Sequence, residues 1–245
     1  MRGRRALLVI GLLASSGCHK AVDGSAHGTE RHVESKPVPP ELITSEEMRL
    51  ADSGQSSFKL LPGKVYRVVG RVRNISVTQS GQPQVQFTGF GATLDPASAD
   101  AAKSVDADAY VALDCPYQSH DGNTELQLDH CKNLQSVPSV SAQEYVQSYE
   151  NNAFKADAEY KDKEVVISGK LRLKDKLIDG RDYLDIIAVP PDISSATAII
   201  APEARAMSDG YATVGSLTVV LCQGGYRYNE AGSVGLKDCR FLQNY

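Results

Sequence analysis

The sequence predicts a mainly β protein made of two tandem, five-stranded Greek-key barrels, each preceded by a helix. Three observations predict this fold class. The same three blocks of sequence occur twice in the same order, the blocks alternate apolar with polar residues, and a helix-capping motif precedes each copy.

The repeat is the strongest of these signals. LLPGKVYRVVGRVRNI at 60–75 matches EYKDKEVVISGKLRLK at 159–174, and Gly70 aligns with Gly169. DAYVALDC at 108–115 then matches SLTVVLC at 216–222, and LQLDHCKNL at 126–134 matches VGLKDCRFL at 234–242. Two copies of one domain, at 41–137 and 138–245, are the simplest account. The short polar stretch SVPSVS contains the expected boundary.

Each copy opens with a helix signal. Thr44 is followed three residues later by Glu47, and Ser141 by Glu144, which is the capping-box spacing. In the second helix, four residues at helical spacing form a stripe that predicts core packing: Tyr145, Tyr149, Ala153 and Ala156.

Strands follow each helix. In the second copy, Val165, Ile167, Leu171 and Leu173 are expected on one side, and Ser168, Lys170, Arg172 and Lys174 on the other. Gly169, in the middle of this long strand, predicts a bend. Further strands are expected at 183–189, 197–201, 217–222 and 234–241, with a short helical piece at 202–207. The first copy follows the same plan, with its helical insert near 95–103.

A long bent first strand, five strands in all, and a helix between the third and fourth describe the OB-fold. The segment at 150–171 also resembles the tRNA_anti-like family of OB-fold bacterial lipoproteins, which has an N-x-x-A-D-x-x-Y-K-x-K pattern before a strand containing Gly. Seven residues match this pattern approximately: Asn152, Ala156, Asp157, Tyr160, Lys161, Lys163 and Gly169. The resemblance covers about 141–243 well and 58–135 more weakly, because the first copy lacks the Asn/Ala/Asp signature. It implies the fold and leaves the ligand open.

The N-terminus has the layout of a cleavable export signal. Arg2, Arg4 and Arg5 precede nine mostly apolar residues at 6–14 and small residues at 15–17. Nine residues rise only ~14 Å as a helix, too short to span a ~30 Å hydrocarbon core. LASSGC resembles the lipobox of bacterial lipoproteins, although Ser15 stands where most have Leu.

We therefore expect a signal peptide at 1–17, a lipid on Cys18 that anchors the protein to the membrane, and a flexible tether at 18–40. His19, rather than Asp, after the lipidated cysteine suggests the periplasmic face of the outer membrane, by resemblance to lipoprotein sorting.

Four cysteines remain once Cys18 carries lipid, and an even set in an exported protein predicts disulfides. Of three connectivities, the repeat favours one bridge within each copy, between its fourth and fifth strands. The expected pairs are Cys115–Cys131 and Cys222–Cys239.

The sequence has no G-x-S-x-G, H-E-x-x-H or phosphate-loop motif. His130 lies beside Cys131, but the equivalent Cys239 has no neighbouring His, so we expect a surface residue. A zinc site from Cys115 and His120 has no counterpart in the second copy. No enzyme activity, cofactor or metal is expected.

Basic residues on the outer side of both first strands are candidates for binding an anion, or simply keep a strand face solvated. They are Arg67, Arg71, Arg73, Lys170, Arg172 and Lys174. Without the three arginines of the signal the chain has 23 basic and 30 acidic residues, a net charge of −7, and nucleic acid is not an expected partner. The sequence therefore predicts a lipid-anchored, non-enzymatic envelope protein that binds a protein or glycan. Polyanion binding through the basic strand faces is the alternative.

Overall fold

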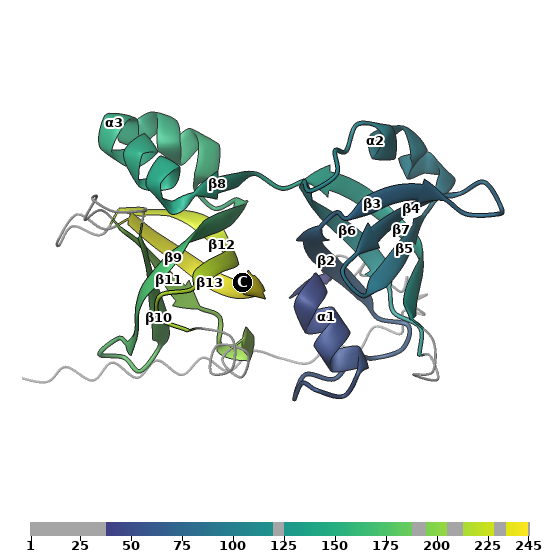
Figure 1. The fold of residues 1–245 in the computed structure, drawn as a ribbon, viewed down its shortest axis with the longest axis horizontal. Helices are drawn as coiled ribbons and strands as arrows, with labels where there is room; N and C mark the ends of the chain where they lie inside the picture. The colour runs from purple at the N-terminus through teal and green to yellow at the C-terminus, as the bar shows by residue number, and fades with distance from the viewer. Residues whose placement is uncertain (1–37, 120–124, 188–194, 205–212, 228–233, 245) are drawn as a thin grey trace, which may run out of the picture. The chain divides into compact units, whose positions relative to one another are not determined.

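The computed structural model describes residues 38–119, 125–187, 195–204, 213–227 and 234–244. The predicted signal, Cys18 and most of the tether lie outside these residues, as do the ends of the segments expected at 183–189 and 202–207. Residues from Pro39 to Tyr245 form one compact unit (Figure 1). Within the described ranges, no helix combines the length and the apolar character needed to cross a bilayer.

The first copy contains seven strands and two short α-helices. In chain order these are β1 (Glu41–Thr44), α1 (Ser45–Asp52), β2 (Val65–Arg71), β3 (Asn74–Val77), β4 (Pro83–Phe87), β5 (Phe90–Leu94), a 3₁₀ turn (Pro96–Ser98), α2 (Ala99–Lys103), β6 (Tyr110–Pro116) and β7 (Leu126–Ser136). The strands form one sheet in the order β1-β2-β6-β7-β5-β4-β3.

This sheet closes because β2 and β3 are two halves of one long first strand. The amide of Val72 donates to Ala109 beside β6, and the amide of Arg73 donates to Gln86 of β4. The chain thus leaves its pairing with β6 and joins β4 within two residues. The helical segment at 96–103 confirms the insert expected near 95–103.

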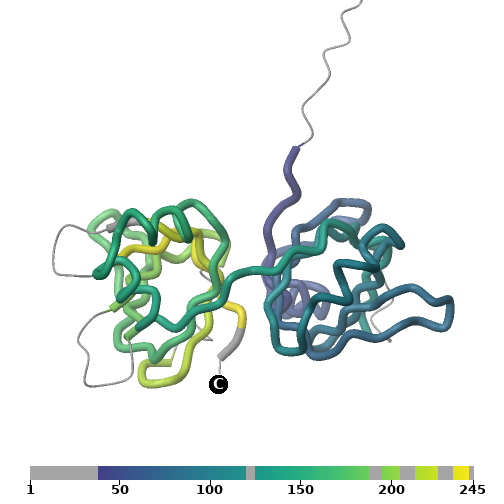
Figure 2. Tube along the Cα trace, turned by 90° about the horizontal axis from the view of Figure 1, so that it is seen from above, coloured from purple at the N-terminus to yellow at the C-terminus, as the bar shows by residue number. Residues whose placement is uncertain are grey.

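The second copy repeats this plan. Its elements are β8 (Ser139–Ser141), α3 (Ala142–Tyr160), β9 (Glu164–Lys176), β10 (Asp182–Ile187), β11 (Ser195–Ile200), a 3₁₀ turn (Pro202–Ala204), β12 (Leu217–Arg227) and β13 (Val234–Asn244). The order is β10-β11-β13-β12-β9-β8, and an additional β10–β9 pairing closes a five-stranded barrel. In Figure 2 each set of strands curls round on itself, and the segment carrying β8 joins the two.

Both copies share one topology: the first strand pairs with the second and fourth, and the third pairs in parallel with the fifth. This is the five-stranded Greek-key barrel of the OB-fold. The predicted fold class is therefore confirmed, and we refer to the first and second barrels.

The capping boxes are also confirmed. Thr44 caps α1 and Ser141 caps α3. In each case the backbone amide of the cap residue donates a hydrogen bond to the carboxylate of the Glu three residues later. The sequence did not reveal the short strand before each helix. β1 and β8 each pair in parallel with the first strand of their own barrel, in equivalent registers.

Gly169 lies where β9 changes partners from β12 to β10. A Cβ there would lie 2.6 Å from Cγ2 of Ile186 and 2.9 Å from the Ile187 carbonyl oxygen, so only glycine allows the approach. Four residues after Gly169, the prediction for Leu173 is wrong, because its side chain is exposed. A bulge places Arg172 between the pairs Leu171–Ile186 and Leu173–Asp185, and one extra residue reverses the inward and outward sides of the strand.

Each barrel encloses its own apolar core. Tyr66, Phe90 and Leu113 are among the largest buried side chains of the first, and Tyr145, Ile167 and Phe241 of the second. A disulfide joins the fourth and fifth strands in each core: Cys115 to Cys131, and Cys222 to Cys239. These are the pairs that the repeat favours.

Candidate functional site

The two barrels meet through outward-facing residues of their first, fourth and fifth strands. On β2 and β6, Val69 and Ala112 point away from the barrel core, and on β12 Val219 and Leu221 do the same. With three further residues they form a separate buried apolar cluster. Its members are Val69, Ala112, Val137, Val166, Val219, Leu221 and Leu242.

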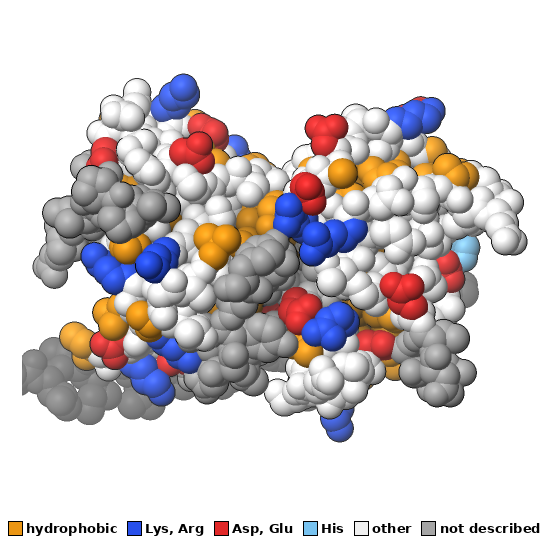
Figure 3. Space-filling view, in the orientation of Figure 1, with side chains coloured by type: hydrophobic (Ala, Val, Ile, Leu, Met, Phe, Trp, Pro, Cys, Tyr) orange, Lys and Arg blue, Asp and Glu red, His pale blue; other side chains and the backbone are white. Residues whose placement is uncertain are grey.

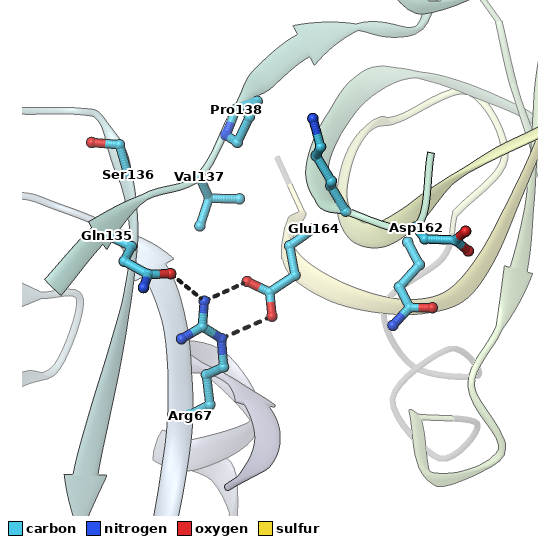
Figure 4. Close-up of a pocket in the computed structure, with 9 residues that line it drawn as sticks. Arg67, Gln135, Ser136, Val137, Pro138, Asp162 and Glu164 are labelled. Carbon is cyan, nitrogen blue, oxygen red and sulfur yellow. Dashed lines mark hydrogen bonds and ion pairs between the residues drawn. The ribbon is translucent and has the colours of Figure 1, made fainter. Parts of the chain in front are cut away.

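Polar contacts flank this cluster, and Arg67 makes most of them (Figure 4). Its Nε and Nη2 donate to the two carboxylate oxygens of Glu164 at 2.9 and 3.1 Å. Nη2 also donates to Gln135 Oε1 at 3.0 Å, and Nη1 lies 3.5 Å from Asp114. The hydrogen bonds that Arg67 donates to the Glu164 carboxylate raise the pKa of Arg67. A guanidinium in this fork-to-fork geometry fixes both distance and orientation.

A second ion pair lies deeper in the interface. Arg240 of β13 donates to Glu47 of α1 at 3.2 Å, and the two side chains are only 12% and 7% exposed. Glu47 is also the glutamate of the α1 capping box, and its carboxylate accepts a hydrogen bond from the Thr44 amide at 2.8 Å. Burial raises the pKa of Glu47, and its contacts with Arg240 and Thr44 oppose this.

A hollow of about 370 Å³ opens beside Arg67, where the chain passes from one barrel to the other at Val137 and Pro138. All of its charged side chains have partners among the described residues. Lys163 donates to the Ala158 carbonyl at 2.6 Å, and Asp162 pairs with Lys237 at 2.9 Å. A ligand would have to displace Glu164 to reach the guanidinium. The charged groups of the hollow therefore stabilise the junction between the barrels and are not open for binding.

The structure distributes the six basic candidates along the first strands of the two barrels, and among the described residues at least three of them pair with carboxylates. Arg67 contacts Glu164, Arg71 pairs with Asp108 at 3.0 Å, and Arg172 pairs with Asp185. Arg73 donates to the Thr88 hydroxyl at 3.0 Å. Lys170 is exposed and makes no ion pair within the described residues, and Lys174 is half-buried. The six do not form one cluster of open cations.

Of the other predicted residues, Cys18 and His120 lie outside the described ranges. His130 is exposed, with Nδ1 3.5 Å from Asp95. It adopts a positive φ of 58°, and Asp238, at the equivalent position before Cys239, adopts a positive φ of 51°. Among the described residues, no three His, Cys, Asp or Glu side chains come together as a metal site.

Sequence reasoning missed the interface between the barrels. The signal that could have found it is the continuous apolar run, such as Val219–Cys222 or Val165–Ile167, because strands that are buried on both sides do not alternate.

No protein-family model matches the sequence, and no curated protein matches it. Solved structures that resemble the chain include the following three. A chain from Klebsiella pneumoniae described as a "putative nucleic acid-binding lipoprotein" is 16% identical, with a TM-score of 0.37 over 44% of this chain and 92% of its own. The p202 HIN2 domain is 10% identical, with a TM-score of 0.30 over 74% and 92%. The single-stranded DNA binding protein of Thermus aquaticus is 12% identical, with a TM-score of 0.18 over 75% and 83%.

All three TM-scores lie below 0.5, so the fold assignment depends on the strand order and pairing described above. Membership of the tRNA_anti-like family stays a prediction.

Proposed function

We propose that this protein is a lipid-anchored, non-enzymatic binding protein of the bacterial cell envelope, whose tandem OB barrels bind a protein or glycan. One observation supports the binding role most directly. The barrels meet through their first, fourth and fifth strands, and no residue of β4, β5, β10 or β11 belongs to the shared apolar cluster. The second and third strands are the usual ligand face of an OB-fold, and among the described residues they stay outside that cluster in both barrels.

The location is supported by two further features. The N-terminal sequence has the layout of an export signal ending at Cys18. Both barrels contain a disulfide, and structural disulfides persist in oxidising compartments outside the cytosol. We place the anchor at the periplasmic face of the outer membrane, on the basis of His19.

Changing Cys18 to Ser tests the anchor. The natural chain is expected to take up a palmitate label and to fractionate with the outer membrane, whereas Cys18→Ser takes up none and stays unprocessed or soluble. A labelled Cys18→Ser protein would rule out Cys18 as the lipidated residue, and an unlabelled natural chain would rule out the lipid anchor. Cross-linking in intact envelopes, followed by purification of the lipidated protein, would then identify the partner.

Polyanion binding is the second candidate function, and nucleic acid falls within it. The observation in its favour is that Lys170 is exposed without an ion pair among the described residues. Against it, Arg67, Arg71 and Arg172 are already paired with carboxylates.

A further inference from the structure

Uncharged polar side chains cover the second and third strands of the first barrel. Two rows cross the sheet: Asn74, Gln86, Gly91 and Gln127 pair in sequence across β3, β4, β5 and β7, and Ser76, Gln84 and Thr93 form the next row. Gln84 and Gln86 point outward because Val85 and Phe87 between them are buried in the core. We call these seven residues the amide face.

The glutamines of the amide face form a hydrogen-bonded chain. Gln86 Nε2 donates to Gln84 Oε1 at 2.8 Å, and Gln84 Nε2 donates to Gln127 Oε1 at 2.8 Å. Each amide has two N–H donors and a carbonyl with two lone pairs, so donors and acceptors remain on both sides of this chain. Ordering a free glutamine side chain costs up to ~2 kcal/mol. Because these three are already held by hydrogen bonds, a ligand that binds them avoids this cost.

Gly91 makes the arrangement possible. It is buried beneath the glutamines, and a Cβ at this position would lie 2.5 Å from Gln127 Oε1, 2.9 Å from Gln84 Nε2 and 3.0 Å from Gln86 Nε2. Any other residue would push the amides apart. A glycine inside a strand weakens the sheet, and often marks a place where another group approaches closely.

We propose that the amide face binds an uncharged, hydroxyl-rich glycan. Sugar hydroxyls both donate and accept hydrogen bonds, which matches a surface of fixed amides without charge. In Figure 3 the surface over β3, β4 and β5 is mostly white, the colour of uncharged polar side chains and backbone. This inference deepens the proposed function, since it selects the glycan from the two kinds of partner.

Other macromolecules fit this surface less well. A single-stranded nucleic acid needs cations for its phosphates and aromatic rings for its bases, and the amide face has neither. A protein partner is held mainly by large apolar or aromatic anchors, which are also absent from these seven residues.

The second barrel shows that the amide face is not a general property of the fold. At the positions of Gln84 and Gln86 its register places Tyr183 and Asp185. The carboxylate of Asp185 is paired with Arg172. The two barrels therefore present different chemistry on equivalent strands, and the glycan site is assigned to the first alone.

The test is an NMR titration of the mature chain, residues 18–245, with chitohexaose and cellohexaose, both uncharged. At least one is expected to shift backbone amides of β3, β4, β5 and β7. Gln84→Ala with Gln127→Ala should weaken binding by about tenfold or more, since each lost hydrogen bond is worth ~1 kcal/mol. Gly91→Val keeps every glutamine but displaces the amides, and should weaken binding similarly.

Gln55→Ala with Gln143→Ala is the matched control, because it removes two exposed glutamines outside the amide face. It should leave the titration unchanged, and the spectra themselves report whether each variant is folded. The proposal is overturned if neither oligosaccharide shifts these strands, or if only heparin or oligo(dT) does. Failure here would leave the lipid anchor and a protein partner intact, because those depend on the separate Cys18 experiment.

Discussion

Arg67 shows how one side chain holds the junction between the barrels together. It comes from β2 of the first barrel, yet its closest partner is Glu164, the first residue of β9 in the second. Arg67 also donates a hydrogen bond to Gln135, which lies near the end of β7 in the first barrel. The guanidinium therefore contacts residues on both sides of the connecting segment at 137–138, which it keeps close to both barrels.

A double-mutant cycle of Arg67→Ala and Glu164→Ala should give a coupling of about 1 kcal/mol in the unfolding free energy, because the pair is bidentate and partly shielded from water. Denaturant unfolding measures it. The exposed pair Asp179–Arg181 in the β9–β10 turn is the control, and should show a coupling near zero. Equal couplings for the two pairs would contradict the bracing role.

The basic candidates give a second prediction at this scale. If they bind polyanions, Arg71→Glu with Lys170→Glu should reduce retention on heparin far more than Lys59→Glu with Lys155→Glu, which makes the same charge change elsewhere. Elution salt concentration is the measurement. Equal losses would show only the general effect of net charge and would remove the polyanion site.

At the scale of elements, the caps of α1 and α3 connect local sequence to tertiary structure. Each cap residue ends a short parallel strand and also begins a helix, so it positions the helix against the first strand of its own barrel. In α1 the capping Glu47 additionally holds Arg240 of the second barrel. The capping box therefore contributes to packing as well as to helix stability.

Ser141→Ala should lower the unfolding free energy by about 1 kcal/mol, because the Glu144 amide loses its acceptor at the start of α3. Ser148→Ala is the control on the same helix. Its hydroxyl bonds back to the Glu144 carbonyl and contacts Tyr160, and neither contact caps the helix, so the change should be smaller than that at Ser141. Equal destabilisation by both substitutions would contradict the cap.

The same cap gives a pH dependence. The hydrogen bond from the Ser141 backbone, and then that from its side chain, lower the pKa of Glu144 below 4.5. A folded-state pKa below the unfolded value adds stability at pH values above 4.5, and this contribution is lost as the pH falls through the folded pKa. The difference in unfolding free energy between the natural chain and Glu144→Gln, measured by denaturant unfolding, should therefore become smaller as the pH falls below 4.5.

Much of the element structure could be predicted, for local physical reasons. The capping boxes, the helical stripe and the glycine at the bend each depend on neighbours in sequence. Leu173 could not be placed, because the bulge at Arg172 is set by pairing with β10. The amide face was overlooked although QPQVQ at 82–86 alternates glutamine with other residues. Its significance depends on Gln127, which is distant in sequence.

At the scale of the whole molecule, the two copies of one barrel pack against each other through different residues. The apolar cluster combines Val69 and Ala112 of the first with Val219 and Leu221 of the second. Leu50 of α1 also packs against the core cluster of the second barrel. A contact of this kind cannot be inferred from periodicity, since it depends on how two folded surfaces fit. Independent folding of 41–137 and 138–245 stays a prediction.

The central claim is that the chain consists of two barrels and that each barrel contains its own disulfide. Digestion of the oxidised mature protein without reductant, followed by mass spectrometry, tests it most directly. The account predicts one linked peptide pair joining Cys115 to Cys131 and another joining Cys222 to Cys239. Reduction should then destabilise the fold by about 2–5 kcal/mol for each bridge. Peptides linking Cys115 or Cys131 to Cys222 or Cys239 would contradict the account, since they require a single intertwined domain.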